Sequence, residues 1–314
     1  MNNTIHLHRI SLGTFLLAVA AFLSLSGTAK GSVVDLGQAG QFALLALNGG
    51  IQDSGPTGPD ANPYSVNGPV GVASTGQQFQ DSGSRTYNGP IYLHSGDTYN
   101  NSAPGVPQPT MGPSVDSLLE QAKQDAFNAS SAALQLGQNP TATFGTINND
   151  FSITESSSGH YVFNINTINF SGGKALTLNA PGGSTYLLNV SSGLVLTPGS
   201  IVLAGGLTAD NVLINYTGSS DIRFSGGSNS SRVFGTILAP DANVVLSPGF
   251  VAGSIIASAI QMSSGANVEL VPVPEVTPSS VIFGFLGLLV AVSSRRVLAG
   301  RARAVSTQRN VRRG

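Results

Sequence analysis

The feature that most constrains the fold is a short strand-like motif that returns after a nearly constant number of residues. Gly235–Ala239 (GTILA) is echoed by Gly253–Ala257 (GSIIA), a step of 18 residues, and Leu246–Gly249 (LSPG) by Met262–Gly265 (MSSG), a step of 16. Steps of this size match one coil of a parallel β-solenoid, in which each coil buries its inward side chains by stacking on its neighbours.

Other regions of the chain have the same texture. Runs rich in β-branched and aromatic residues, such as 160–165 (HYVFNI) and 211–216 (NVLINY), alternate with Gly, Asn and Pro, and two Asn-Gly-Pro segments at 67–69 and 88–90 precede short apolar runs. β-branched residues favour strands, while Gly and Asn supply turn positions with positive φ. We predict a mainly β chain folded as a parallel β-solenoid. An antiparallel β-sandwich is the alternative, because it also uses short strands about every 8–12 residues.

One long helix is predicted at about 114–136. Ser114 is its expected N-cap, Asp116 and Glu120 suit the positive end of the helix dipole, and Gly137 is expected to stop it. The opposite face is polar, so we expect the helix to pack along one side of a larger body. The apolar residues expected to form its packing face are Val115, Leu118, Leu119, Ala122, Ala126, Phe127, Ala133 and Leu134.

The N-terminus has the pattern of a secretory signal peptide, assigned to residues 1–31. Arg9 precedes an apolar stretch at 10–25, and small residues follow it, so we expect cleavage after Ala29 or Gly31. The chain has no cysteine. An exported protein of this sequence therefore has no disulfides, and must be stabilised by repetitive backbone pairing and packing.

Composition argues against several functional classes. Only 9% of residues are charged, against about 25% in a typical domain, so the surface is solvated mainly by hydroxyls and amides. Between residues 32 and 274 five basic residues face fourteen acidic ones, which predicts no nucleic-acid partner. With His94 and His160 the only histidines outside the signal peptide, a zinc site is not expected, and His160 is interpreted as a strand-end residue.

No motif points to catalysis or to a cofactor. The sequence has no G-x-S-x-G elbow, no Walker A loop and no G-x-G-x-x-G entering a helix, so we predict no catalytic residue and no cofactor. Two hypotheses stay open. Paired carboxylates acting on a polysaccharide are one, because sequence does not give their separation. Ca²⁺ binding by Asp53, Asp60, Asp81 and Asp97 in Gly- and Asn-rich loops is the other, the alternative being that these are solvated turn residues.

The C-terminal half resembles the choice-of-anchor A domain of exported bacterial proteins. The resemblance lies in 185–193 (TYLLNVSSG), 211–227 and 234–258, above all Gly235–Ala242 (GTILAPDA). Segment 33–47 (VVDLGQAGQFALLAL), with a helix ahead of the strand region, is similar to the related ice-binding-like adhesive domain. Together these resemblances cover roughly 33–270. They imply a right-handed parallel β-solenoid flanked by a long helix, with no catalytic residue to transfer.

The tail, 272–314, resembles a PEP-CTERM sorting signal. It carries Pro274 and Glu275, an apolar segment at 281–292, and then Arg295 and Arg296 at the start of an arginine-rich end. It departs from the family in having Val276 where a second proline would stand, with Pro278 two residues later. The resemblance implies processing by an exosortase at the inner membrane of Gram-negative, often exopolysaccharide-producing bacteria.

The apolar segment is short for a permanent anchor. Its twelve residues would span about 18 Å as a helix, well under the roughly 30 Å of a hydrocarbon core. The arginines that follow it favour a cytoplasmic tail and an exported body. We therefore expect 281–292 to hold the inner membrane only transiently.

These observations predict an exported, non-enzymatic cell-surface or extracellular-matrix protein. We expect it to be adhesive or structural, to associate with exopolysaccharide or cell-surface glycans, and to be sorted by an exosortase. An ice-binding protein on the same fold is an alternative, although no Thr-x-Thr ladder recurs from coil to coil; a polysaccharide-acting enzyme is another. The expected order is a signal peptide (1–31), a first β part (32–113), the helix (114–137), the main solenoid (138–271) and the tail (272–314).

Overall fold

The computed structural model describes residues 33–55, 64–83, 85–101, 106–226, 231–263 and 265–271 of the 314-residue chain. Tertiary contacts divide the chain into Met1–Pro274 and Glu275–Gly314, and the second unit lies outside the described residues. The signal peptide (1–31) and the sorting tail (272–314) also lie outside them and stay predictions.

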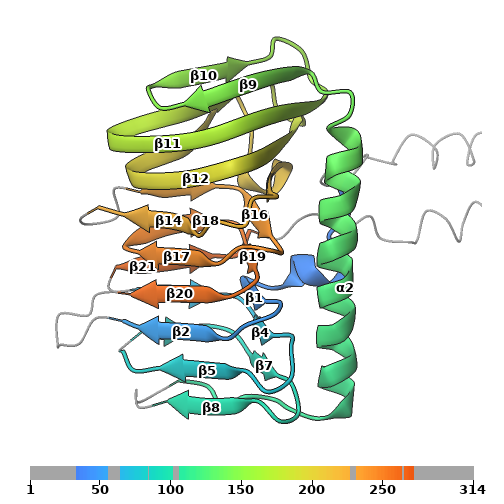
Figure 1. Ribbon diagram of the computed structural model, residues 1–314, viewed down its shortest axis with the longest axis vertical. Helices are drawn as coiled ribbons and strands as arrows, with labels where there is room; N and C mark the ends of the chain where they lie inside the picture. The colour runs from blue at the N-terminus through green and yellow to red at the C-terminus, as the bar shows by residue number, and fades with distance from the viewer. Residues whose placement is uncertain are drawn as a thin grey trace, which may run out of the picture. The chain divides into compact units, whose positions relative to one another are not determined.

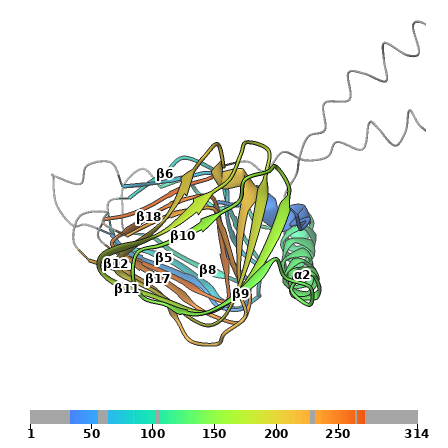
Figure 2. The ribbon, with the colours of Figure 1, turned by 90° about the horizontal axis from the view of Figure 1, so that it is seen from above.

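The strands form one parallel sheet that is wound into three-sided coils (Figures 1 and 2). Two long strands, β11 (His160–Asn179) and β12 (Thr185–Ala204), run across all three sides. The side that carries the helix, here the helix face, contains β1 (Leu44–Ala46), β4 (Val70–Val72), β7 (Ile91–Leu93), β9 (Ala142–Ile147), β13 (Val212–Tyr216), β16 (Thr236–Ala239) and β19 (Ile255–Ala257). The next side, here the amide face, contains β2 (Ile51–Ser54), β5 (Gln78–Asp81), β8 (Thr98–Asn101), β14 (Ile222–Ser225), β17 (Val244–Ser247) and β20 (Ile260–Ser263). The third face contains β3 (Ser65–Asn67), β6 (Thr86–Tyr87), β10 (Phe151–Thr154), β15 (Arg232–Phe234), β18 (Gly249–Ala252) and β21 (Ala266–Glu269).

The pairing confirms the predicted parallel β-solenoid. Within the described ranges every strand pairing is parallel, as in β16 with β19 and β17 with β20, which rules out an antiparallel sandwich. The predicted steps are coil lengths: Ile237 pairs with Ile255, Leu246 with Met262, and Val70 with Ile91. The right-handed sense of the coil stays a prediction.

The chain enters the solenoid in the middle of the stack and closes on itself there. Strand β1 pairs with both β4 and β19, β2 with both β5 and β20, and β3 with both β6 and β21. From the first coil the chain runs to the β8 end, returns along helix α2 (Pro113–Leu136), and begins again at β9 (Figure 1). The last coil therefore stacks on the first one.

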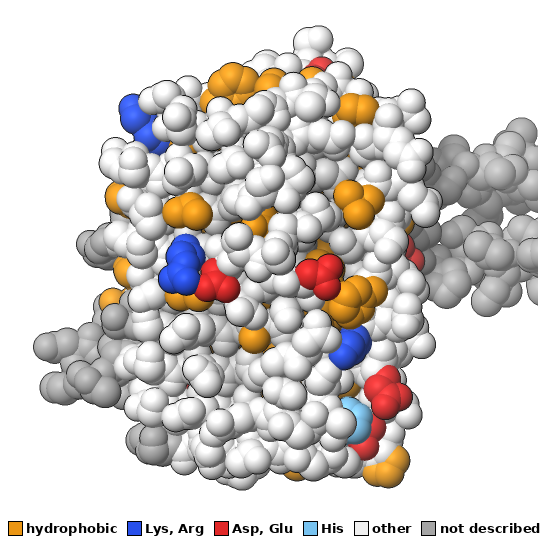
Figure 3. Space-filling view, in the orientation of Figure 1, with side chains coloured by type: hydrophobic (Ala, Val, Ile, Leu, Met, Phe, Trp, Pro, Cys, Tyr) orange, Lys and Arg blue, Asp and Glu red, His pale blue; other side chains and the backbone are white. Residues whose placement is uncertain are grey.

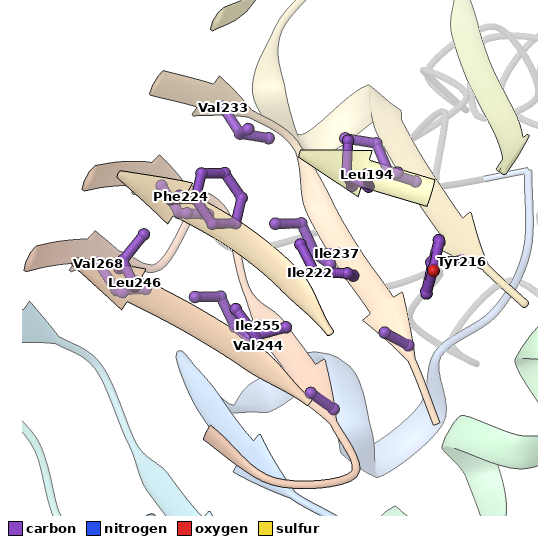
Figure 4. Packing of buried hydrophobic residues seen from close by; sticks show 14 of the residues in the cluster. Leu194, Tyr216, Ile222, Phe224, Val233, Ile237, Val244, Leu246, Ile255 and Val268 are labelled. Carbon is purple, nitrogen blue, oxygen red and sulfur yellow. The ribbon is translucent and has the colours of Figure 1, made fainter. Parts of the chain in front are cut away.

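Inward side chains of successive coils stack to form the core. Phe224 pairs in register with Leu246, and Ile222 with Val244, and all four side chains are fully buried (Figure 4). Burial of each such side chain contributes about 1.5–3 kcal/mol relative to exposure. Because each coil covers the next, the core runs through the whole stack.

Helix α2 packs on the outside of the helix face, as predicted. Its buried residues include Leu119, Ala122 and Ala126, which lie in one apolar cluster with Leu45 and Leu238 of the sheet. The expectation for its start was wrong: the helix begins at Pro113, with Gly112 as N-cap at φ 131°, so Ser114 is not the cap. Proline suits the first helical position because the N–H it lacks has no partner there.

The C-terminal end of α2 rests on a row of asparagines rather than on apolar residues. Asn164, Asn189 and Asn215 are register neighbours on β11, β12 and β13. Asn189 Nδ2 donates to the carbonyl of Ala133 at 2.9 Å, and Asn164 Nδ2 donates to that of Gly137 at 2.8 Å. Carbonyls of the last helical turn, which have no partner within the helix, are thereby satisfied.

Two sequence expectations change at this end of the helix. Leu134 was predicted to pack inward, yet it is 47% exposed, because the sheet beneath this turn is polar. Gly137 does follow the helix, but at φ −67°, so it is not needed for a left-handed turn. A Cβ there would lie 2.6 Å from Asn189 Nδ2, so glycine is needed for close approach to the asparagine row.

Candidate binding face

The amide face presents every second side chain of its strands to solvent. In β2, Ile51 and Asp53 are buried, whereas Gln52 and Ser54 are exposed. This alternation follows from the pleat of a strand with one face on the core. In-register stacking then places the outward residues of successive strands in straight rows.

The first row consists of amides. Gln52 of β2 pairs with Gln80 of β5 on one side and with Gln261 of β20 on the other, and Gln80 pairs with Asn100 of β8. Neighbouring strands lie about 4.8 Å apart, so this amide row (Asn100, Gln80, Gln52 and Gln261) repeats at that spacing. Each amide both donates and accepts hydrogen bonds.

The second row consists of hydroxyls. Ser54 pairs with Ser263, Ser247 with Ser225, and Ser171 with Thr197. Ser263 Oγ donates to Ser247 Oγ, which joins two of these pairs. Thr197 and Ser225 directly follow the paired Leu196 and Phe224, so the row runs from β2 across to β11. We call Ser54, Ser263, Ser247, Ser225, Thr197 and Ser171 the hydroxyl row.

The face has little charge. In β2, β5, β8, β14, β17 and β20, all of which the structure describes, Arg223 is the one charged side chain on the outer side, and its Nη2 lies 2.6 Å from Asp221 Oδ2. Figure 3 shows this side of the molecule covered mainly by uncharged polar side chains and backbone. A hollow of about 450 Å³ lies on it, lined among others by Gln52, Gln261 and Asn243. Such a surface suits a neutral, hydrated partner that forms many hydrogen bonds.

Two of the four predicted calcium-loop aspartates lie inside the solenoid. Asp53 and Asp81 are paired residues of β2 and β5, and both are about 1% exposed. They are therefore neither loop ligands nor solvated turn residues. Arg85 binds Asp53 through Nε at 2.5 Å and Nη2 at 3.1 Å, and the Tyr87 hydroxyl donates to Asp53 Oδ2 at 2.8 Å.

Burial governs the protonation of this cluster. Burial raises the pKa of Asp81 to about 6, against the opposing hydrogen bond from the Gly83 N–H, and the nearby Asp53 charge adds to the rise. Burial, with the charges of Asp53 and Asp81, also raises the pKa of Tyr87 well above its usual value. Tyr87 is therefore a neutral donor to Asp53 at physiological pH.

The other two predicted aspartates have different outcomes. Asp97 holds a turn, with its oxygens accepting from the Gln77 N–H and the His94 N–H, both at 2.9 Å. Asp60 lies outside the described residues. Within the described ranges, no group of three His, Asp or Glu side chains is placed to hold a metal ion.

The two histidines have structural surroundings. His160 is the first residue of β11, as predicted, and its Nδ1 lies 2.7 Å from the Thr185 hydroxyl. His94 lies near the start of α2, 3.7 Å from Asp116 and 3.6 Å from Glu120. Burial alone would lower the pKa of His94, but the hydrogen bond with Ser95 and the carboxylates of Asp116, Glu120 and Asp97 together raise it.

The predicted sorting residues cannot be placed in this fold. Pro274, Glu275, Pro278, Arg295 and Arg296, and the cleavage-region residues Ala29 and Gly31, lie outside the described residues, as does the apolar segment 281–292. Of the helices that the structure does describe, none is long and apolar enough to cross a membrane.

Comparison with known protein families gives a match that covers most of the chain. A family model described as "Putative Ice-binding-like adhesive domain" matches residues 18–270. The chain belongs to this family. The family match agrees with the solenoid, the flanking helix and the resemblance in segment 33–47. A comparison with curated proteins gave no match.

Solved structures share the fold of this ice-binding-like adhesive domain. A glycosylated ice-binding protein (LeIBP) from Arctic yeast has 20% identity and a TM-score of 0.51, over 78% of this chain and 97% of that one. An ice binding protein from an Antarctic bacterium Flavobacteriaceae has 19% identity and a TM-score of 0.50, over 76% of this chain and 47% of that one. At this identity the likeness concerns the fold.

Sequence reasoning missed both rows of this ice-binding-like adhesive domain. The hydroxyl row recurs after 26, 28, 22 and 16 residues from Ser171 to Ser263, so no fixed period exposes it. The amide row joins β20 to β2 and β5, which are separated by some 200 residues of chain. One signal was available: Gln52, Gln80 and Gln261 each directly follow a large apolar residue, in IQD, FQD and IQM.

Proposed function

We propose that this protein is an exported, non-enzymatic adhesive or structural protein of the cell surface or extracellular matrix, and that its amide face binds exopolysaccharide or cell-surface glycans. The observation that supports this most directly is the row of four amides, Asn100, Gln80, Gln52 and Gln261, on an almost uncharged face. Amides donate to and accept from sugar hydroxyls, and no charge on this row selects for an ionic polymer.

Binding through such a face is distributed over many contacts. A single exposed hydrogen bond contributes little, because each glutamine loses rotamer freedom when it is ordered and because water competes for its amide. A polymer that contacts the row at several points gains from effective concentration, so affinity rises steeply with chain length. We expect weak binding of short fragments and firm retention of long chains on this face.

The test is retention of the protein on the host's own purified exopolysaccharide. The triple variant Gln52→Ala, Gln80→Ala and Gln261→Ala removes three amides from the row, all on outward positions. The matched control, Gln121→Ala, Gln124→Ala and Gln135→Ala, removes three exposed amides from α2. We expect retention to fall about tenfold or more in the first variant and to stay unchanged in the second. Equal retention by both would refute the amide face as the binding surface.

Ice binding is the second candidate, and the hydroxyl row supports it. The row repeats at the strand spacing on a parallel sheet, and the two solved structures reported above are named as ice-binding proteins. The adjacent row of long glutamine side chains is less regular, because each has several rotamers. Thermal hysteresis measured on the full protein decides between the two: a freezing-point gap that disappears in Ser247→Tyr would establish ice binding.

A polysaccharide-acting enzyme has less support. Asp53 and Asp81 are the two carboxylates paired on adjacent strands, and both point into the core, where a polymer has no access. The absence of product release from the host's exopolysaccharide would agree with this.

Export and sorting remain part of the proposal on the strength of the sequence. The signal peptide directs export, 281–292 pauses in the inner membrane, and an exosortase cleaves the tail near Pro274 and Glu275. Intact masses of the mature protein from cells with and without the exosortase test this sequence of events. A mature mass that still includes Arg295–Gly314 in normal cells would rule out cleavage.

A further inference from the structure

A pocket lies at the corner between the helix face and the amide face, beside the end of α2. Its volume is about 300 Å³, at the lower end of the usual range for small-ligand sites of about 300–1,000 Å³. Leu134, Gly137 and Gln138 line it from the helix side. Thr143, Asn164, Asn166, Asn189, Ser191 and Thr217 are the polar residues that line it from the sheet side.

None of the residues that line this pocket carries a charge. The lining contains three asparagines, one glutamine and three hydroxyl side chains, together with apolar atoms from residues such as Leu134. An ionic ligand would find no counter-charge in the lining, and a purely apolar ligand would strand these polar groups. A ring with both C–H surface and hydroxyls matches the lining.

The walls of the pocket are held in place before any ligand binds. Asn164 and Asn189 are fixed by their bonds to the carbonyls of Gly137 and Ala133. Asn166 Oδ1 accepts from the Ser192 hydroxyl at 2.7 Å, which orients its NH₂ group. Preorganised polar groups lower the ordering cost of binding.

We propose that this corner pocket binds a single neutral sugar ring, such as the end unit of a glycan chain. The ring would lie against Leu134 and exchange hydrogen bonds with Asn166, Thr143 and Ser191. Thr167 and Gly193, which follow the lining residues Asn166 and Ser191, begin the amide-face segments of β11 and β12. A chain whose end unit is in the pocket can therefore continue along the amide face, so the inference rests on the proposed glycan function and extends it.

The test uses the full chain and four separate probes: glucose, galactose, mannose and N-acetylglucosamine at millimolar concentration. Saturation-transfer NMR measures binding of each free sugar. We expect saturable binding of at least one probe, abolished by Thr143→Phe, which fills the pocket from an exposed strand position. Asn166→Ala should weaken it about fivefold, the size expected for losing one or two hydrogen bonds.

Two control variants match these changes in chemistry. Thr146→Phe places the same ring on an exposed position of β9 outside the pocket, and Asn148→Ala removes an exposed amide from the following turn. Both should bind the sugar as the unchanged protein does. Absence of saturable binding with all four probes, or binding that survives Thr143→Phe, would overturn the inference.

This outcome can be separated from that of the proposed function. Sugar binding blocked by Thr143→Phe, without retention of exopolysaccharide, would support the pocket and refute polymer adhesion. Retention that depends on Gln52, Gln80 and Gln261, without binding of any probe, would refute the pocket and support the amide face.

Discussion

Arg85 and Asp53 form an ion pair inside the solenoid, with Nε 2.5 Å from Oδ2 and both side chains fully buried. Arg85 also donates to the backbone carbonyls of Ser263 and Ala266, in the last coil. One side chain therefore connects the first coil, through Asp53, to the last coil, some 180 residues later in the chain. The pair lies where the solenoid closes on itself.

Removing Arg85 should destabilise the protein severely. Arg85→Met leaves Asp53 buried without its counter-charge, and breaking a buried pair in this way costs about 3–5 kcal/mol. Chemical denaturation measures the free energy of unfolding. Arg223→Met, which removes an exposed arginine paired with Asp221, should cost less than about 1 kcal/mol. Similar losses in the two variants would contradict the role of Arg85 in closure.

The buried carboxyl of Asp81 should make the protein less stable as the pH rises. Its pKa is raised to about 6 in the fold, chiefly by burial, from 3.8. Its favourable contribution is therefore complete below pH 3.8 and is lost as the pH rises through 6. Asp81→Asn should remove about 2 kcal/mol of this loss, so the variant should be the more stable protein at pH 7.5.

Unfolding free energies measured from pH 4 to pH 7.5 test this expectation. In the Asp81→Asn variant the new amide oxygen can still accept from the Gly83 N–H, which keeps the geometry of the site. Asp241→Asn removes an exposed carboxylate and should keep the wild-type slope. His94, whose pKa is also raised, loses its contribution only above about pH 6.5, so the interval from pH 4 to pH 6 isolates Asp81. An unchanged slope in Asp81→Asn would refute the assignment.

The asparagine row should hold the end of α2 on the sheet. Asn189→Ala removes the donor to Ala133 and leaves Asn215 Nδ2 without its bond to Asn189 Oδ1, at a cost of about 2–3 kcal/mol. Hydrogen exchange should become faster at amides of the last helical turn and stay unchanged near Pro113. Asn169→Ala, at an exposed position of β11, should change neither measurement. Uniform acceleration along α2 would instead indicate global destabilisation.

Local sequence patterns could predict most of the fold. The echo between Gly235–Ala239 and Gly253–Ala257 reported a real coil, and the apolar spacing from Val115 to Ala133 reported a real helix face. Both depend on neighbours that are close in sequence, so their period survives in the chain. Closure did not leave such a trace, because β1 to β3 meet β19 to β21 only through tertiary pairing.

The candidate face was harder to predict for the same reason. Gln52 becomes a neighbour of Gln261 only when the last coil stacks on the first, and coil lengths between 16 and 28 residues hide the hydroxyl row. Asp53 looks like a loop ligand in sequence because Gly and Ser surround it. The fold places it inward because strand alternation from Ile51 fixes its side.

Stacked glycines at one corner give the clearest link between repeat and fold. Gly235 and Gly253 precede β16 and β19 with φ 145° and 144°, a region that side chains rarely adopt. A Cβ on Gly253 would also overlap the carbonyl of Gly235 in the next coil. Gly253→Ala should therefore cost about 3 kcal/mol or more, from backbone strain and displaced coils together.

Gly145→Ala is the matched control for this corner. Gly145 lies in β9 with open space around the position of its Cβ, so alanine there should change stability by less than about 0.5 kcal/mol. Denaturant unfolding of the two variants gives the comparison. A fully stable Gly253→Ala would mean that the coils can separate at this corner without loss. The 18-residue echo would then owe nothing to the close contact between the two glycines.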